Sequence, residues 1–140
     1  MHLFNTLRKM RILLIDDDEW IRGSLQLFFE AEGCQLIALE TAEEGLVALR
    51  EDTYDIIIVD YKLPGQDGIE FLKQIRNAHS DAIKILITAY KSEAVVSEAK
   101  KLGIQGFIEK PFTSETILGS LSYLIKKREK REEIHAKYRD

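Results

Sequence analysis

The sequence predicts an α/β fold, a three-layer α/β/α sandwich around a five-stranded parallel sheet. Three observations carry this prediction: five short apolar runs, helical patterns between them, and a spacing of 20 to 27 residues from the start of one run to the next. The runs are rich in β-branched residues and nearly continuous, as is typical of strands buried on both faces of a parallel sheet. Strands that alternate with helices favour right-handed crossovers within one layered domain.

The expected elements follow one another in a regular order. Between the first two runs, apolar residues recur at helical spacing from Ile21 to Phe29, and Gly33 is placed to end that helix. Residues 68–77 have apolar residues three positions apart, and an apolar stripe extends over residues 117–125. The runs begin at Ile12, Leu36, Ile56, Ile83 and Ile104, and the residues expected to cap helices are Thr41 with Glu44, Ser92 and Thr113.

Composition excludes several classes of protein. A chain of 140 residues predicts a single domain. The net charge of −4 argues against DNA binding through a broad basic surface, and no apolar run reaches the roughly 18 residues that a membrane span needs. Cys34 is the lone cysteine, which excludes an internal disulfide and a cysteine-cluster metal site. A reducing compartment fits best, so we expect a cytoplasmic protein with no direct nucleic-acid or membrane partner.

The two ends of the chain differ from its middle. We expect an N-terminal extension over residues 1–10, one domain over 11–127 and a charged C-terminal helical extension over 128–140. Residues 126–140 hold seven basic and four acidic residues, so their net charge is +3 and the rest of the chain carries −7. Such a tail is typical of a solvated helix with i,i+4 ion pairs, and a partner-binding or linker helix is the alternative.

Polar residues stand where the expected strands end. The first run ends in three aspartates at 16–18, and the third, fourth and fifth end at Asp60, Thr88 and Glu109-Lys110. Ligands of doubly wound sheets bind at this carboxyl edge. Converging carboxylates repel one another unless a cation lies among them, and a few partly exposed oxygen ligands suit Mg²⁺. Asp18 has a simpler alternative role as a helix N-cap.

The same edge holds the parts that phosphoryl transfer needs. A carboxylate is a competent phosphoryl acceptor, and a metal, a fixed cation and a hydrogen-bond donor stabilise the equatorial oxygens. These residues resemble the receiver domain of two-component response regulators over about residues 11–127. The segments that carry the resemblance are Ile-Leu-Leu-Ile-Asp16-Asp17-Asp18, Ile-Val-Asp60-Tyr-Lys-Leu-Pro64-Gly65 with Asp67-Gly68, Leu-Ile-Thr88-Ala89, and Phe107-Ile-Glu-Lys110-Pro111-Phe112.

The resemblance implies a fold and a metal site. The fold is flavodoxin-like, with strand order 2-1-3-4-5. Asp60 would accept a phosphoryl group from a phosphohistidine on a sensor histidine kinase or histidine phosphotransfer protein. The Mg²⁺ ion would be held directly by Asp17, mainly through water by Asp16, and also by Asp60 and the backbone carbonyl of Lys62.

The resemblance also implies a switch. Lys110 would pair with Asp60 and later with the phosphoryl oxygens, which the Thr88 hydroxyl and the Ala89 N–H would also bind. Phe107 matches the aromatic position that turns inward after phosphorylation, in concert with Thr88. The output face would comprise the helix after Ser92, the strand near residues 104–108 and the helix after Thr113.

The resemblance further implies that the Lys110–Pro111 bond is cis. Lys62 and Tyr90 depart from common family patterns at positions that border the path of the attacking water. A phosphorylation switch of this kind promotes only its own phosphoryl transfer and dephosphorylation. Its downstream partner would be an effector protein or an output domain absent from this sequence, and the phosphorylated form would dimerise or bind its target through the output face.

Two other classes share parts of this pattern. A phosphatase of the haloacid-dehalogenase type places its nucleophile after the first strand in an Asp-x-Asp motif, which residues 16–18 contain, but Trp20 fits the continuation poorly. Substrate turnover would distinguish it. A flavodoxin-like binding module needs a hydroxyl- and glycine-rich phosphate loop after the first strand, whereas the acidic run there would repel phosphate. Flavin colour would distinguish that class.

Overall fold

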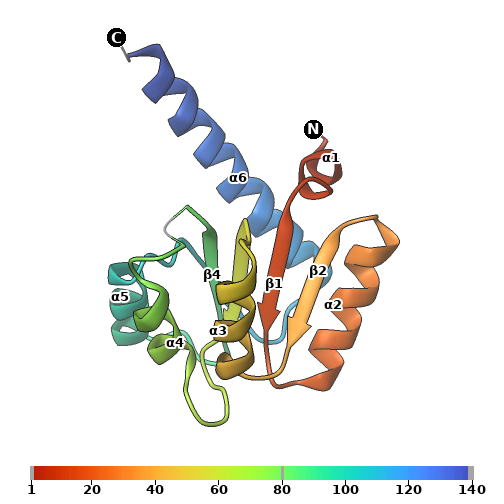
Figure 1. Ribbon diagram of the computed structural model, residues 1–140, viewed down its shortest axis with the longest axis vertical. Helices are drawn as coiled ribbons and strands as arrows, with labels where there is room; N and C mark the ends of the chain where they lie inside the picture. The colour runs from red at the N-terminus through yellow and green to blue at the C-terminus, as the bar shows by residue number, and fades with distance from the viewer. Residues whose placement is uncertain (1, 80, 139–140) are drawn as a thin grey trace.

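The computed structural model describes residues 2–79 and 81–138 and has a parallel sheet between two layers of helices (Figure 1). The strand order is β2-β1-β3-β4-β5, so the predicted fold class and topology are confirmed. The fifth strand begins at Gly106, two residues later than the apolar run suggests. The strands are β1 (Arg11–Ile15), β2 (Gln35–Leu39), β3 (Ile56–Asp60), β4 (Ile83–Thr88) and β5 (Gly106–Glu109).

The helices begin at the residues whose side chains can cap them. Thr41 and Glu44 form the expected capping box, and Ser92 and Thr113 each accept a backbone N–H of the helix that follows. Gly33 ends its helix with a φ of 78°, which favours glycine. The helices are α1 (Leu3–Leu7), α2 (Glu19–Ala31), α3 (Ala42–Glu51), α4 (Gly68–Ile75), α5 (Glu93–Lys101) and α6 (Ser114–Lys137).

Two apolar clusters, one on each face of the sheet, form the core. On one face Ile12 and Leu14 pack with residues of α2 and α6, such as Phe29 and Leu121. On the other face alternate strand residues, Leu13 among them, pack with residues of α3, α4 and α5. Because successive strand side chains point to opposite faces and both faces are covered, the central strands are continuous apolar runs.

The N-terminal segment packs onto this core. The Leu7 side chain of α1 is fully buried in the cluster that contains Phe29. Phe4 contacts Phe28 with ring centroids 6.4 Å apart, and Arg8 Nε donates to the Glu32 carbonyl at 2.7 Å. The domain boundary near residue 11 stays a prediction, but α1 contributes a buried side chain to the core.

The last helix continues well past the core. Helix α6 is unbroken to Lys137, and Figure 1 shows its second half rising beyond the amino edge of the sheet. Arg128 donates to the backbone carbonyl of Asp81 and ties α6 to the turn before β4. The predicted helical extension is therefore helical as far as Lys137, whereas residues 139–140 lie outside the described residues. Within 2–79 and 81–138, no helix is long and apolar enough to cross a membrane.

Candidate functional site

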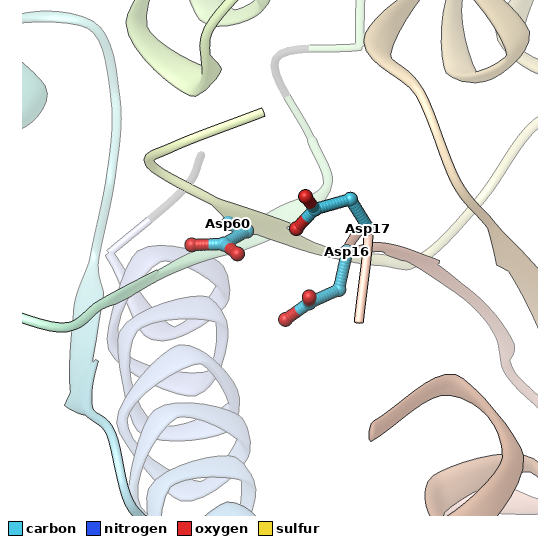
Figure 2. A group of neighbouring side chains, drawn as sticks. All are labelled: Asp16, Asp17 and Asp60. Atoms are coloured by element: carbon cyan, nitrogen blue, oxygen red, sulfur yellow. The ribbon is translucent and has the colours of Figure 1, made fainter. Parts of the chain in front are cut away.

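Three aspartates meet at the carboxyl edge of the sheet. Strands β1 and β3 are parallel neighbours with Ile15 opposite Val59, so Asp16 and Asp60, the residues that come next, lie side by side. Carboxylate oxygens of Asp16, Asp17 and Asp60 all lie within 4.8 Å of one another (Figure 2). Asp16 is fully buried and Asp60 is 3% exposed, while Asp17 is exposed to solvent. The structure thus brings together the three carboxylates that the sequence predicts.

The three carboxylates carry more negative charge than the neighbouring cation balances. Burial raises the pKa of Asp16 to about 6, although the Asp18 N–H donates to Asp16 Oδ1 at 2.9 Å and opposes that shift. Among the described residues, Asp16 Oδ2 is buried and accepts no hydrogen bond, although the Lys110 ammonium lies 3.3 Å away. Together with the carboxylates of Asp17 and Asp60, this oxygen forms a group of oxygen ligands that suits a hard divalent cation. The residues present therefore fit the magnesium that the sequence analysis expects.

Lys110 supplies the fixed cation of the site. Its Nζ lies 2.7 Å from Asp60 Oδ2 and 3.3 Å from Asp16 Oδ2. Burial by itself lowers the pKa of Lys110, but the hydrogen bond to Asp60 and the negative charges of both aspartates raise it overall. The Lys110–Pro111 peptide is cis, as predicted. One ammonium beside three ionised carboxylates leaves a net charge of −2, which a single divalent ion balances.

The loop after β3 returns close to the backbone of Asp60. Gly68, the first residue of α4, donates its N–H to the Tyr61 carbonyl at 2.8 Å. A Cβ at Gly68 would stand 2.5 Å from the Asp60 carbonyl oxygen, so only glycine permits this approach. The N–H of Lys62 faces Asp60 Oδ1 at a long 3.4 Å. The role of the Lys62 carbonyl as a metal ligand stays a prediction.

Thr88 ends β4, and its hydroxyl forms hydrogen bonds within the loop that follows. Its hydroxyl donates to the Tyr90 carbonyl at 2.9 Å and accepts from the Tyr90 N–H at 3.2 Å. Phe107 lies on the neighbouring strand opposite Leu86 and is half-buried. The Lys91 Nζ lies 5.7 Å from the centroid of the Phe107 ring, within the range of a cation–π contact. The exposed Ala89 follows Thr88 at the same rim.

Residues at the start of α2 frame the other side of the site. The Asp18 carboxylate accepts from the Trp20 and Ile21 N–H groups at 2.8 and 3.2 Å, so its simpler role as a helix cap is confirmed. Arg22, which the sequence analysis did not select, donates from Nη1 to the Asp16 carbonyl at 3.0 Å. Its position on the same helical face as Asp18, four residues on, is the only sequence signal for this contact.

An apolar hollow adjoins the site on this side. Trp20 is 80% exposed and lines a hollow of about 700 Å³ together with Phe28, Lys110 and Phe112. The indole therefore lies on the surface and lines the same hollow as Lys110.

Comparisons with known proteins agree with this geometry. The sequence pattern of the response regulator receiver domain matches residues 12–122. A probable C4-dicarboxylate response regulator, DctR of Halalkalibacterium halodurans, is 34% identical over 115 residues, which are 81% of this chain and 50% of that protein. The chain thus spans half the length of this relative.

Two solved structures are similar over most of the chain. A CheY-like response regulator receiver domain protein from Methanospirillum hungatei is 29% identical with a TM-score of 0.81, covering 87% of this chain and 98% of that one. A response regulator protein from Burkholderia pseudomallei, solved with a phosphorylated aspartic acid, a calcium ion and citrate, is 25% identical with a TM-score of 0.76. That likeness covers 90% of this chain and 74% of the other.

Proposed function

Because the chain belongs to the response regulator receiver domain family, we propose that it is a phosphorylation-dependent signalling switch with Asp60 as its phosphoacceptor. The observation that carries this proposal is the Asp60 carboxylate at the end of β3, held by Lys110 at 2.7 Å beside two further aspartates. The donor would be a phosphohistidine on a sensor histidine kinase or a histidine phosphotransfer protein, in the cytoplasm. The protein would promote only its own phosphorylation and dephosphorylation.

The site residues divide the work of phosphoryl transfer. An oxygen of Asp60 forms a bond to phosphorus while the bond from phosphorus to the donor nitrogen breaks, which yields an acyl phosphate and a neutral histidine after proton uptake. The Lys110 ammonium moves from the Asp60 carboxylate to the phosphoryl oxygens and stabilises their charge. Asp16, Asp17, Asp60 and the Lys62 carbonyl would hold Mg²⁺, which when bound neutralises the clustered carboxylates and draws in the phosphoryl oxygens.

Similar proteins support this assignment. The Burkholderia pseudomallei protein carries a phosphorylated aspartic acid together with a calcium ion. Calcium and magnesium are both hard cations that take oxygen ligands. Since the chain spans half of the DctR relative, we propose that its output lies in a separate effector protein or in a domain outside this sequence.

The test of the assignment is the substitution Asp60→Asn. Asn is nearly isosteric but forms no acyl phosphate, so labelling by acetyl phosphate in Mg²⁺ should fall from near one phosphoryl group per chain to none while the fold is retained. Intact-mass spectrometry measures the label and circular dichroism the fold. Asp18→Asn is the matched control, because Asp18 caps α2 outside the carboxylate cluster, and it should label normally. Labelling that survives Asp60→Asn, or disappears in Asp18→Asn, contradicts the assignment.

We propose that the signal leaves through α5, β5 and α6. Before phosphorylation the Thr88 hydroxyl is bonded to Tyr90. After it, the hydroxyl would turn to a phosphoryl oxygen, and the half-buried Phe107 ring would move into the space released. Ring burial is favourable without a hydroxyl partner. The shift is limited by how much better the phosphoryl group binds the second state than the first.

Beryllofluoride with Mg²⁺ mimics the phosphoryl group and tests this route by NMR. Amide shifts should change in α5, at Phe107 and in the first half of α6, and phosphorylation-dependent dimerisation, where it occurs, should bury the same face. Thr88→Ala should leave Asp60 able to accept the phosphoryl group but reduce the shift at Phe107. Changes confined to the loops after β1 and β3 would contradict the proposed route.

A further inference from the structure

A second charged site lies at the opposite edge of the sheet. A pocket of about 450 Å³ opens between the carboxyl ends of α4 and α5, near the first residues of β4. We call it the basic pocket, after the five cationic side chains that line it: Arg76, Lys84, Lys100, Lys101 and Arg131. No aspartate, glutamate or aromatic residue is among its lining residues in the described part of the chain. The Asp60 site lies at the other end of the strands, so the two are separate.

The buried Lys84 distinguishes this pocket from a group of surface cations. It is the second residue of β4 and is only 3% exposed. Its Nζ donates to the His79 carbonyl at 2.7 Å, the one acceptor it has among the described residues, so two N–H donors stay available. Burial lowers the pKa of Lys84, and the negative charge of nearby Asp81 offsets this in part. Gly103 flanks the ammonium, since a Cβ there would lie 4.0 Å from Nζ.

The helix ends near the pocket balance only part of its positive charge. Cations at the carboxyl end of a helix commonly balance its dipole, which amounts to about half a negative charge per helix. Two helix ends together with Asp81 then account for about two of five positive charges. None of the five cations forms an ion pair within 2–79 and 81–138. The pocket thus keeps a surplus of about three charges in a protein whose net charge is −4.

The lining chemistry selects the ligand. Two side-chain amides, of Asn77 and Gln105, add neutral hydrogen-bond donors to the cations. The Gln105 oxygen accepts from the Lys84 N–H at 3.0 Å, which leaves the amide nitrogen free to donate. No aromatic ring lines the pocket to stack on a nucleobase. We propose that the basic pocket binds a small anion with two linked phosphate groups, either free pyrophosphate or the diphosphate of a nucleotide.

Binding there would couple to the C-terminal helix. Arg131 reaches the pocket from the part of α6 that extends past the sheet, one turn after Arg128 contacts the Asp81 carbonyl. An anion held by Lys84 and Arg131 would bridge the sheet and this extension. Hydrogen exchange over residues 128–137 should therefore slow when the anion binds.

Calorimetric titration with pyrophosphate in EDTA and 150 mM NaCl tests the proposal, since EDTA removes metal from the aspartate site. The double substitution Lys100→Gln with Arg131→Gln should weaken binding at least 10-fold, because each lost charge-assisted contact is worth roughly that factor. Lys84→Met should weaken it similarly. Lys130→Gln is the matched control: it removes the same charge from α6 at a residue that does not line the pocket, and should change the affinity less than 2-fold.

The ligand series separates the possible sources of the diphosphate. ADP and pyrophosphate of similar affinity would support recognition of the diphosphate itself. Sulfate or an oligoglutamate peptide that binds as tightly as pyrophosphate would overturn the proposal, because neither has linked phosphates. Absent binding of pyrophosphate, or equal losses in the pocket variants and in Lys130→Gln, would also overturn it. Should Lys84→Met fail to fold, the surface double variant still decides, and Asp60→Asn should bind pyrophosphate normally.

Discussion

Two lysines, one near each edge of the sheet, have pKa values that are shifted in opposite directions. At the carboxyl edge, Lys110 lies 2.7 Å from Asp60, and the aspartates raise its pKa despite burial. At the amino edge, Lys84 is more deeply buried, has a backbone carbonyl as its acceptor, and its pKa is lowered by burial. The first lysine is therefore held mainly by carboxylate charges, and the second by a backbone carbonyl with a smaller contribution from Asp81.

The difference shows what each edge lacks. Three carboxylates and one ammonium leave the carboxyl edge short of about two positive charges, which a divalent cation supplies. The basic pocket, with five cations and two helix carboxyl ends, has an excess of positive charge. Opposite imbalances at the two ends of one parallel sheet favour a metal at one edge and an anion at the other.

The largest expected change in the free energy of unfolding distinguishes Lys110 from Lys84. In EDTA at neutral pH, Lys110→Met should lower the free energy of unfolding by about 2–4 kcal/mol, since it leaves Asp16 and Asp60 buried without a counter-charge. Lys84→Met should change it by about 1 kcal/mol or less. It loses one hydrogen bond but also removes the cost of burying an ammonium group.

Urea unfolding monitored by circular dichroism measures both, because urea, unlike guanidinium, does not screen charges. Mg²⁺ should restore most of the loss in Lys110→Met and leave Lys84→Met unchanged. A larger loss of unfolding free energy in Lys84→Met than in Lys110→Met would contradict this contrast. It would mean that Lys84 stabilises the fold more than Lys110 does.

A middle-sized effect with the opposite sign is expected for Asp16→Asn. The folded-state pKa of Asp16, about 6, is above its unfolded value, so the ionised carboxylate destabilises the fold. Stability from this group is fully present below about pH 4 and is lost as the pH rises through about 6. Asn keeps the acceptor for the Asp18 N–H, so in EDTA at pH 7.5 the variant should be more stable by about 1–3 kcal/mol.

The same variant should show little gain at pH 3, where Asp16 is largely protonated in both states. Added Mg²⁺ should stabilise the wild type more than the variant, because the variant has lost one charge near the ion. Urea midpoints at the two pH values, each with EDTA and with Mg²⁺, measure these differences. A variant less stable than the wild type at pH 7.5 in EDTA would show that repulsion at this edge is already relieved by Lys110.

The acidic edge could be predicted from the sequence and the basic edge could not. Asp16, Asp60, Thr88 and Lys110 each end an apolar run, and parallel strands bring their ends together, so one-dimensional spacing was enough. Lys84 lies inside an apolar run, where its direction depends on the strand's position over α4 and α5. Its neighbours Arg76 and Arg131 come from helices whose ends meet only in three dimensions.

The N-terminal helix was missed for a related reason. Residues 1–10 have no long helical period, and α1 spans only Leu3–Leu7. Its stability comes from packing, chiefly from the burial of Leu7 and the contact of Phe4 with Phe28, which no local pattern reveals. The late start of β5 at Gly106 has a similar origin, because Ile104 is buried against α5 without pairing in the ladder.

The smallest effect expected concerns the switch near the carboxyl edge. The Lys91 ammonium lies 5.7 Å from the Phe107 ring and favours the half-buried ring position described here. A cation–π contact at an exposed site is worth about 0.5–1 kcal/mol, so Lys91→Gln should shift the Phe107 rotamer equilibrium toward the inward state by about 2- to 5-fold.

NMR of the Phe107 ring without beryllofluoride measures this shift. The charge-matched control is Lys62→Gln, which changes a lysine on the neighbouring loop. In the proposed switch, bound beryllofluoride favours the inward ring in both proteins, so the fully bound spectra of wild type and Lys91→Gln should coincide at Phe107. A ring equilibrium unchanged by Lys91→Gln, or changed equally by Lys62→Gln, would show that the ring responds to Thr88 alone or to net charge.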